Sequence, residues 1–113
     1  EHQAIQFMLA DMAIDIFTAK YATLQTAALV EAAMQGKGRL PVKEISIVKA
    51  HSVEACQRVF DAAIQVHGGV GLTDDLPLNE GWRIARTLRI PDGTSEIQRR
   101  TIARQMLRGD VTF

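Results

Sequence analysis

The longest stretch of this sequence without glycine or proline runs from residue 1 to residue 35, and it constrains the fold more than any other feature. Its first apolar side chains follow spacings of four, three and four, which place on one helix face Ile5, Leu9, Met12 and Ile16. Further along, this stripe is widened by Phe17, Leu24, Ala28 and Val30. Gly36-Lys37-Gly38 then supplies the glycines at which helices commonly stop. We therefore predict one long helix over residues 2–35.

Three further helices are expected in the rest of the chain. Pro41 can begin a second long helix that ends near His67, where Gly68-Gly69-Val70-Gly71 stops it. The apolar positions of this second helix are Ile45, Val48, Val53, Cys56, Val59, Phe60, Ala63 and Ile64. A third helix runs from Pro77 to about Arg89, and a fourth begins near Thr94 or Ser95 and ends near Leu107.

No segment alternates between apolar and polar residues, so no strand is predicted. Long helices with short connections indicate an all-α antiparallel bundle of two long and two shorter helices. Residues 1–113 are expected to form one domain. Such an uneven set leaves an apolar face uncovered unless another helix or another copy of the chain covers it.

The charge and composition of the chain exclude several classes of protein. A formal net charge of zero argues against a general nucleic-acid binder. From Leu76 onward four acids accompany seven arginines, which are Arg83, Arg86, Arg89, Arg99, Arg100, Arg104 and Arg108. A phosphate-bearing ligand would suit this basic end, and a solvated face is the ordinary alternative.

The sequence also bears on compartment and chain boundaries. No apolar run is long enough to span a bilayer, and no signal peptide is visible. The single cysteine, Cys56, excludes an intrachain disulfide, fits a reducing compartment and is expected to serve in packing. Because the chain starts without Met inside a helical pattern, we expect a piece of a longer protein.

The turn at residues 90–98 places one carboxylate directly before a helix. Pro91 and Gly93 keep Asp92 out of regular structure. Ser95 and Gln98 form a capping-box pattern, which predicts the start of the fourth helix. Unpaired N–H groups at that start would keep the carboxylate ionised. Taken alone, Pro-Asp-Gly is also an ordinary turn.

Other motifs fail. Gly69-Val70-Gly71 follows no strand and lacks a third glycine and a following Lys, so it is neither a dinucleotide fingerprint nor a P-loop. The spacing of His2, His51 and His67 is not that of metal ligands, and no metal site is predicted.

Three segments together resemble the flavin-dependent acyl-CoA dehydrogenases. Gln65-Val66-His67-Gly68-Gly69-Val70-Gly71 resembles that family's Gln-x-x-Gly-Gly-x-Gly element. Arg83 to Arg86, followed by Asp92 to Arg99, resembles the segment that carries the family's catalytic carboxylate. The opening residues 1–12 resemble a helix of its C-terminal bundle. The resemblance implies an incomplete C-terminal four-helix bundle that lacks its first helix, together with missing N-terminal helical and middle β-domains.

The resemblance also implies a reaction. In the family a carboxylate removes the proton alpha to an acyl-CoA thioester carbonyl while a hydride leaves the beta carbon for FAD. Asp92 matches the carboxylate position, and its own backbone N–H is implied to bind the thioester oxygen. Gly93 is implied to allow close passage of the thioester, and Arg104 matches an arginine linked to substrate binding. Some relatives carry the base on the preceding helix, which this chain lacks.

Residues implied to contact FAD are Gln65, Gly68, Gly69, Thr94 and Glu96. For these positions the alternatives are a helix stop at the glycines and helix capping at Thr94 and Glu96. Three departures stand out from the family pattern. Asp92 replaces the usual Glu, Ile84 stands where many relatives have Asp, and Pro91 stands where many have an aromatic residue. The acyl chain length that relatives prefer is therefore not assigned to this protein.

Two functions follow as expectations. The first is an FAD-dependent acyl-CoA dehydrogenase, active as the full-length parent and inactive as the isolated piece. Its implied partners are an acyl-CoA substrate, an electron-transfer acceptor and further copies in a dimer or tetramer. Its expected location is the cytoplasm, or the mitochondrial matrix or peroxisome in a eukaryote. The second is a non-enzymatic helical oligomerisation module.

Overall fold

Four α-helices and one short 3-10 helix make up the computed structural model, which describes residues 2–113. The α-helices are α1 (Gln3–Met34), α2 (Val42–His67), α3 (Leu78–Thr87) and α4 (Ser95–Leu107), and the 3-10 helix is η1 (Gly68–Leu72). No strand occurs among the described residues, so the all-α prediction is confirmed. The predicted helix boundaries agree with these bounds within two residues.

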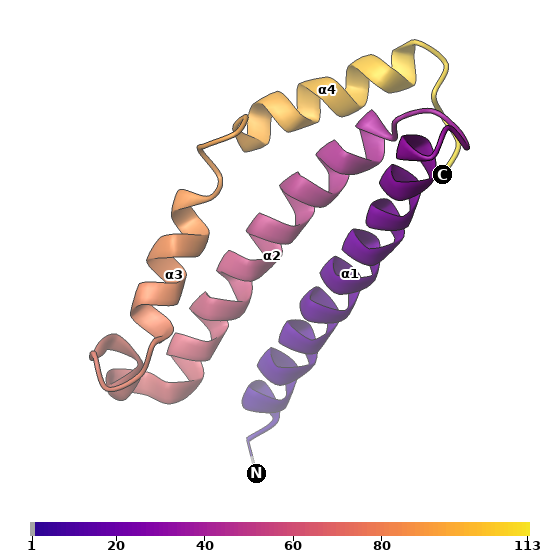
Figure 1. Ribbon diagram of the computed structural model, residues 1–113. Helices are drawn as coiled ribbons and strands as arrows, with labels where there is room; N and C mark the ends of the chain where they lie inside the picture. The colour runs from indigo at the N-terminus through magenta and orange to yellow at the C-terminus, as the bar shows by residue number, and fades with distance from the viewer. Residues whose placement is uncertain (1) are drawn as a thin grey trace.

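Helix α2 is the centre of the arrangement. It contacts α1, α3, α4 and η1, whereas α1 contacts only α2 among the described elements. Figure 1 shows α1 and α2 side by side and antiparallel, with α3 returning along α2 and α4 crossing near the start of α2. The bundle is therefore built around one helix and is open on the far side of α1.

Glycines end the first and last helices in the same way. After α1, Gly36 has a φ of 75°, and the N–H groups of Gly36 and Lys37 donate to the carbonyls of Ala33 and Ala32. After α4, Gly109 has a φ of 97°, and Asp110 N–H donates to Gln105 O. Both ends are Schellman motifs, in which a left-handed glycine lets backbone N–H groups satisfy the last helical carbonyls.

The C-terminal segment is fixed by a fully buried lysine of α2. Lys43 Nζ donates to Asp110 O at 3.2 Å and to the Thr112 carbonyl, and it lies 4.0 Å from the Phe113 ring centroid. Arg39 also pairs with Asp110. A hydrogen bond from Arg39 is the main cause that lowers the pKa of the Asp110 carboxyl, and Lys43 adds to it. These contacts join the end of the chain to the start of α2.

The face that α1 turns toward α2 agrees only in part with the predicted one, since Ile5 and Met12 are partly buried as predicted whereas other members of the stripe are exposed. The residues of α1 that are at least partly buried include Met8, Met12, Asp15, Ala19, Ala22 and Thr26. Arg58 of α2 binds the Asp15 carboxylate at 2.6 and 2.9 Å. Leu9 and Ile16, which were predicted to share the apolar face, are 52% and 55% exposed. Because α1 is apolar almost all round, its sequence periodicity does not single out one face.

Little of the apolar surface is buried within the chain. Only alanines are fully buried among the described apolar side chains other than proline, namely Ala50, Ala55 and Ala85. The radius of gyration is 16.9 Å, whereas a compact chain of this length has about 13 Å. Cys56 is exposed, which makes the prediction that it serves in packing wrong for this chain.

Candidate active site

The turn between α3 and α4 carries Asp92 in a strained conformation. Asp92 has a φ of 54° and Gly93 a φ of 87°, and Asp92 is the only described non-glycine residue with a positive φ. Aspartate tolerates this left-handed region better than most residues do. The turn is closed by a hydrogen bond of 3.1 Å from Ser95 N–H to Arg89 O. It therefore presents an exposed carboxylate on a fixed backbone.

The cap of α4 lies one residue before the predicted one. Thr94 is the N-cap, and its Oγ1 accepts from Ile97 N–H at 3.3 Å. Ser95 is buried inside the first turn, so the predicted capping box of Ser95 and Gln98 is wrong. Gln98 Nε2 instead donates to the carbonyls of Asp92 and Gly93 at 3.2 and 3.3 Å. The glutamine side chain therefore reaches back over the turn.

A lysine of α2 also binds this turn. Lys49 Nζ donates to the carbonyls of Leu88 at 2.9 Å, Pro91 at 3.0 Å and Gly93 at 2.8 Å. An ammonium group has three N–H donors, so these three acceptors use all of them. The stem of Lys49 also lines an apolar groove between α1 and α2, with a volume of about 590 Å³.

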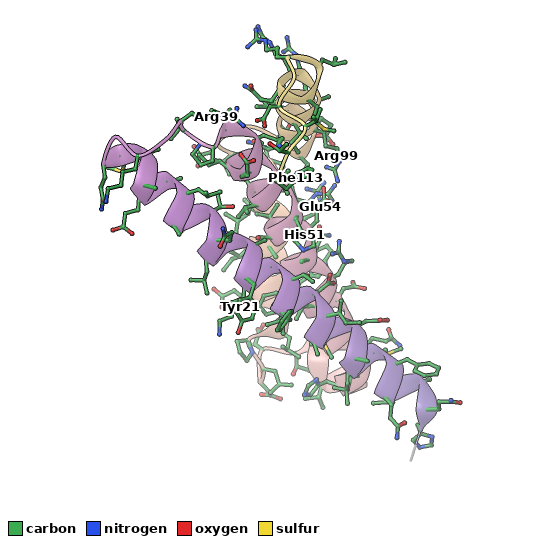
Figure 2. The ribbon with its side chains drawn as sticks, turned by 90° about the vertical axis from the view of Figure 1, so that its right-hand side faces the viewer. Tyr21, Arg39, His51, Glu54, Arg99 and Phe113 are labelled. Carbon is green, nitrogen blue, oxygen red and sulfur yellow. The ribbon has the colours of Figure 1, made fainter. Side chains whose placement is uncertain are left out.

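An ionic junction holds the two helices that flank the turn. Glu54 of α2 accepts two hydrogen bonds from Arg99 of α4, at 2.7 and 2.8 Å, and lies 3.7 Å from Arg89 after α3. Figure 2 shows Glu54 and Arg99 next to one another. The Arg99 hydrogen bond is the main cause that lowers the pKa of Glu54, and burial opposes it. Glu54 thus connects α2 to both ends of the Asp92 segment.

Glu96 lies in the first turn of α4, two residues beyond the N-cap Thr94. It is exposed, and hydrogen bonds from its own backbone N–H and from the Thr94 hydroxyl hold its pKa below the ordinary value. A carboxylate at a helix N-terminus is favoured by the helix dipole. Helix capping therefore accounts for Thr94 and Glu96 locally, and their predicted contact with FAD stays a prediction.

The second predicted cluster is a glycine corner, defined here as Gln65, Gly68, Gly69 and Gly71. Gln65 is exposed in the last turn of α2, and Gly68 has a φ of 62°. A Cβ atom added at Gly71 would lie 2.7 Å from Ile64 O, so this glycine is needed for packing. A Cβ atom at Gly69 would meet no described atom within 4 Å. Nothing in the described chain therefore requires a glycine at position 69.

The structure brings some predicted site residues together and separates others. Asp92, Gly93, Thr94 and Glu96 share one turn, whereas the glycine corner lies at the other end of α3 (Figure 1). Helix α3 has ten residues, which corresponds to a length of about 15 Å. Arg104 is exposed in the last turn of α4 and has no ion pair among the described residues. None of the main pockets formed by residues 2–113 is lined by residues of both clusters.

The histidines form no site of their own. His51 Nε2 lies 3.2 Å from Thr18 Oγ1, and His67 Nδ1 lies 2.8 Å from Ala63 O. Across residues 2–113, no three His, Cys, Asp or Glu side chains gather closely enough to hold a metal ion. None of the helices in this range combines the length and apolar character that crossing a membrane requires.

Sequence reasoning missed Lys49, Glu54 and the role of Gln98. Each acts on residues that lie 5 to 45 positions away along the chain. A lysine and a glutamate spaced along an amphipathic helix are ordinary surface residues by pattern alone. The sequence offered one signal, the turn itself, because its carbonyls need hydrogen-bond donors, but it did not show which element supplies them.

The glycine corner fits the group that the resemblance implies, which is FAD. Its open position at Gly69 lets a ligand approach the backbone without meeting a Cβ atom. The exposed side chain of Gln65 adds a polar group that can donate and accept hydrogen bonds.

Comparisons with known proteins agree on one family. A family model described as "Acyl-CoA dehydrogenase, C-terminal domain" matches residues 1–107. A probable acyl-CoA dehydrogenase of Bacillus subtilis, YngJ, is 41% identical over 94% of this chain and 27% of its own length. The human mitochondrial short-chain specific acyl-CoA dehydrogenase is 39% identical over 94% of this chain and 24% of its own.

A solved structure gives the same result. A putative acyl-CoA dehydrogenase from Mycobacterium abscessus superposes with a TM-score of 0.83 at 34% identity, covering 92% of this chain and 25% of that one. The chain spans between 13% and 27% of the length of the curated relatives it matches.

Proposed function

The chain belongs to the acyl-CoA dehydrogenase family as a C-terminal helical domain, and we propose that the protein carrying it dehydrogenates an acyl-CoA thioester between its alpha and beta carbons. One observation supports this most. Asp92, which the resemblance matches to the family's carboxylate position, has an exposed side chain and a backbone held by Lys49 and Gln98. A base held in this way suits the removal of a weakly acidic proton.

Asp92 serves as the base in this proposal. A proton alpha to a thioester is a very weak acid, so catalysis requires a positioned base and stabilisation of the developing enolate oxygen. The Asp92 carboxylate takes the proton, and the Asp92 backbone N–H donates to the thioester oxygen. Among residues 2–113 no acceptor is bonded to this N–H, so it is free to do so. Because aspartate is one methylene shorter than glutamate, the substrate must approach the turn closely, which Gly93 permits.

FAD, when bound, supplies the acceptor for the hydride that leaves the beta carbon. Gln65, Gly68 and Gly69 would hold it from the glycine corner, and Thr94 and Glu96 would contact it beside the base. Since the two clusters lie at opposite ends of α3, we propose that the corner serves the flavin of a neighbouring subunit in a homodimer or homotetramer. Arg104 is proposed to assist substrate binding, and an electron-transfer acceptor must reoxidise the reduced flavin.

Asp92→Asn in the full-length protein tests the proposal. Asparagine has the same shape and also tolerates a positive φ, so the turn should persist without its base. We expect acyl-CoA turnover to fall by about a hundredfold or more while FAD remains bound. The measurement is acyl-CoA-dependent reduction of an artificial electron acceptor, normalised to flavin absorbance.

Asp92→Glu is the matched control, since it keeps a carboxylate and should retain activity. Undiminished turnover in Asp92→Asn would reject Asp92 as the base. A wild-type protein that oxidises no acyl-CoA of any chain length would reject the function itself.

A further inference from the structure

We propose that Lys49 is a positioning residue that aims the Asp92 backbone N–H at the thioester oxygen. This inference rests on the proposed function and extends it to a residue 43 positions before the base. It assigns Lys49 a role in the rate of the reaction, because the lysine sets the direction of a hydrogen-bond donor rather than touching the substrate.

The contact that matters is the one to Pro91. Lys49 Nζ lies 3.0 Å from Pro91 O, and Pro91 O belongs to the same peptide unit as Asp92 N–H. That peptide is trans, because no cis peptide bond occurs in the described chain. In a planar trans peptide the carbonyl and the N–H point in opposite directions. With the carbonyl fixed on the ammonium group of α2, the N–H of Asp92 must face away from α2.

The next peptide units of the turn are fixed as well. Gly93 O accepts from Lys49 Nζ at 2.8 Å and from Gln98 Nε2 at 3.3 Å, and Asp92 O accepts from the same glutamine at 3.2 Å. The conformation that they hold is strained, with Asp92 at a φ of 54°. A strained residue keeps its conformation only where its surroundings over-determine it. Lys49 supplies the one positive charge in this set of contacts.

The charge of Lys49 also acts through the peptide bond. A carbonyl that accepts a hydrogen bond from an ammonium group polarises its peptide unit, which makes the N–H of that unit a stronger donor. A donor aimed in advance at a developing oxyanion contributes to the rate because no reorganisation is needed during the reaction. Lys49 thus both directs and strengthens the proposed oxyanion donor.

A purely structural role would use only part of this geometry. Lysine side chains often bind the last carbonyls of a helix, and the contact to Leu88 O after α3 fits that pattern. The carbonyls of Pro91 and Gly93 lie beyond the helix and within the turn that carries the base. A purely structural role predicts that mutation of Lys49 leaves kcat per bound flavin unchanged, whereas the positioning role predicts a lower kcat.

Lys43 of α2 offers a matched control. It is a second lysine on the same helix that binds backbone carbonyls, in its case those of Asp110 and Thr112. It is more deeply buried than Lys49, and the segment it fixes is the C-terminal end of the chain rather than the turn. Lys43→Met should therefore reduce stability without changing kcat per bound flavin.

The experiment compares Lys49→Met, Lys49→Arg and Lys43→Met with the wild type in the full-length flavin-loaded protein. We expect Lys49→Met to lower kcat per bound flavin by about 10- to 100-fold, as misplacement of a catalytic group does, with KM changed less than about threefold. Arginine keeps the charge but not the three-point geometry, so Lys49→Arg should lie between Lys49→Met and the wild type.

Three outcomes would overturn the inference. The first is a kcat for Lys49→Met within twofold of the wild type. The second is an equal fall in kcat for Lys43→Met. The third applies if Lys49→Met does not fold, since a wild-type kcat in Lys49→Arg would then exclude the role. Absence of acyl-CoA oxidation by the wild type would instead reject the proposed function, so the two failures are distinguishable.

Discussion

At the scale of single residues, strain and chemistry coincide at position 92. Asp92 is the only described non-glycine residue with a positive φ, and it is also the candidate base. Position 93 favours glycine for steric reasons as well as for its positive φ, because a Cβ atom there would lie 2.7 Å from Gln98 Nε2. Strained residues gather at functional sites, where the surrounding structure maintains them. At this turn the maintaining contacts come from Lys49 of α2 and Gln98 of α4.

The glycine corner gives a prediction about two neighbouring glycines. A Cβ atom at position 69 would meet no described atom within 4 Å, so we expect Gly69→Val to change the stability of the protein by less than about 0.5 kcal/mol. It should still weaken FAD retention, because the added side chain would fill the space through which the ligand approaches the backbone. The measurement is flavin content after gel filtration, with thermal unfolding of the apoprotein alongside.

Gly71→Ala serves as the contrast. Its Cβ atom would lie 2.7 Å from Ile64 O, and overpacking of this kind destabilises proteins by about 1–3 kcal/mol. Flavin content in Gly69→Val equal to that of the wild type would reject the role assigned to Gly69.

At the scale of secondary-structure elements, α2 organises the site although it carries neither candidate base nor substrate contact. Its side chains reach α1 through Arg58, the Asp92 turn through Lys49, and α4 through Glu54. Helix α3 packs on it at Gly81, where a Cβ atom would lie only 2.2 Å from the ring of Phe60. The position of the turn is therefore set by the packing of α3 and α4 on one helix.

The junction at Glu54 predicts a pH-dependent stability. The Arg99 hydrogen bond lowers the pKa of Glu54 in the folded state below its ordinary value of 4.5. The contribution of the pair is therefore complete above the unfolded-state pKa and is lost as the pH falls through the lower, folded-state pKa. We expect Glu54→Gln to lower the Tm by about 2 °C near neutral pH, since a pair with a half-exposed arginine contributes about 1 kcal/mol or less.

The difference in Tm should shrink as the pH falls below 4.5, and thermal unfolding from pH 7 to pH 3 measures it. Asp61→Asn is the control on the same helix, because Asp61 is exposed and has no ion pair within residues 2–113. A Tm difference for Glu54→Gln that stays constant over this range would contradict the assignment.

At the scale of the whole molecule, the chain exposes more surface than a complete domain would. Its accessible area is 7870 Å², whereas a folded monomer of 12.5 kDa has about 6200 Å². Much of the exposed apolar area follows one side of α1, where the side chains that are at least half exposed are Phe7, Ile14, Phe17, Tyr21 and Leu24. Such a face indicates that the chain packs against further protein in its natural setting.

This exposed surface predicts how the isolated chain behaves. Residues 1–113 expressed alone should show no acyl-CoA dehydrogenase activity and little affinity for FAD, because the candidate base and the glycine corner share no pocket in one copy. They should also self-associate through the apolar side of α1. The measurements are acceptor reduction with acyl-CoA, flavin titration and sedimentation velocity. Detectable turnover by the 113-residue chain would contradict the prediction.

The sequence by itself determined the elements of this fold. Glycine stops after residues 35 and 67, and prolines at 41 and 77, are local signals whose effect on the backbone does not depend on distant contacts. For the same reason the turn at Asp92 and the stop at Gly68 were found where the structure has them. The family resemblance named residues for the site, whose roles remain proposals.

Only the tertiary structure decided which surfaces meet. The side of α1 that packs on α2 was not readable, because a helix apolar all round offers no preferred face until a partner helix selects one. The cap at Thr94 in place of Ser95 depends on how the turn closes onto Arg89. The contacts of Lys49 with carbonyls 39 to 44 residues away depend on α3 and α4 packing on α2, a long-range arrangement that no local pattern encodes.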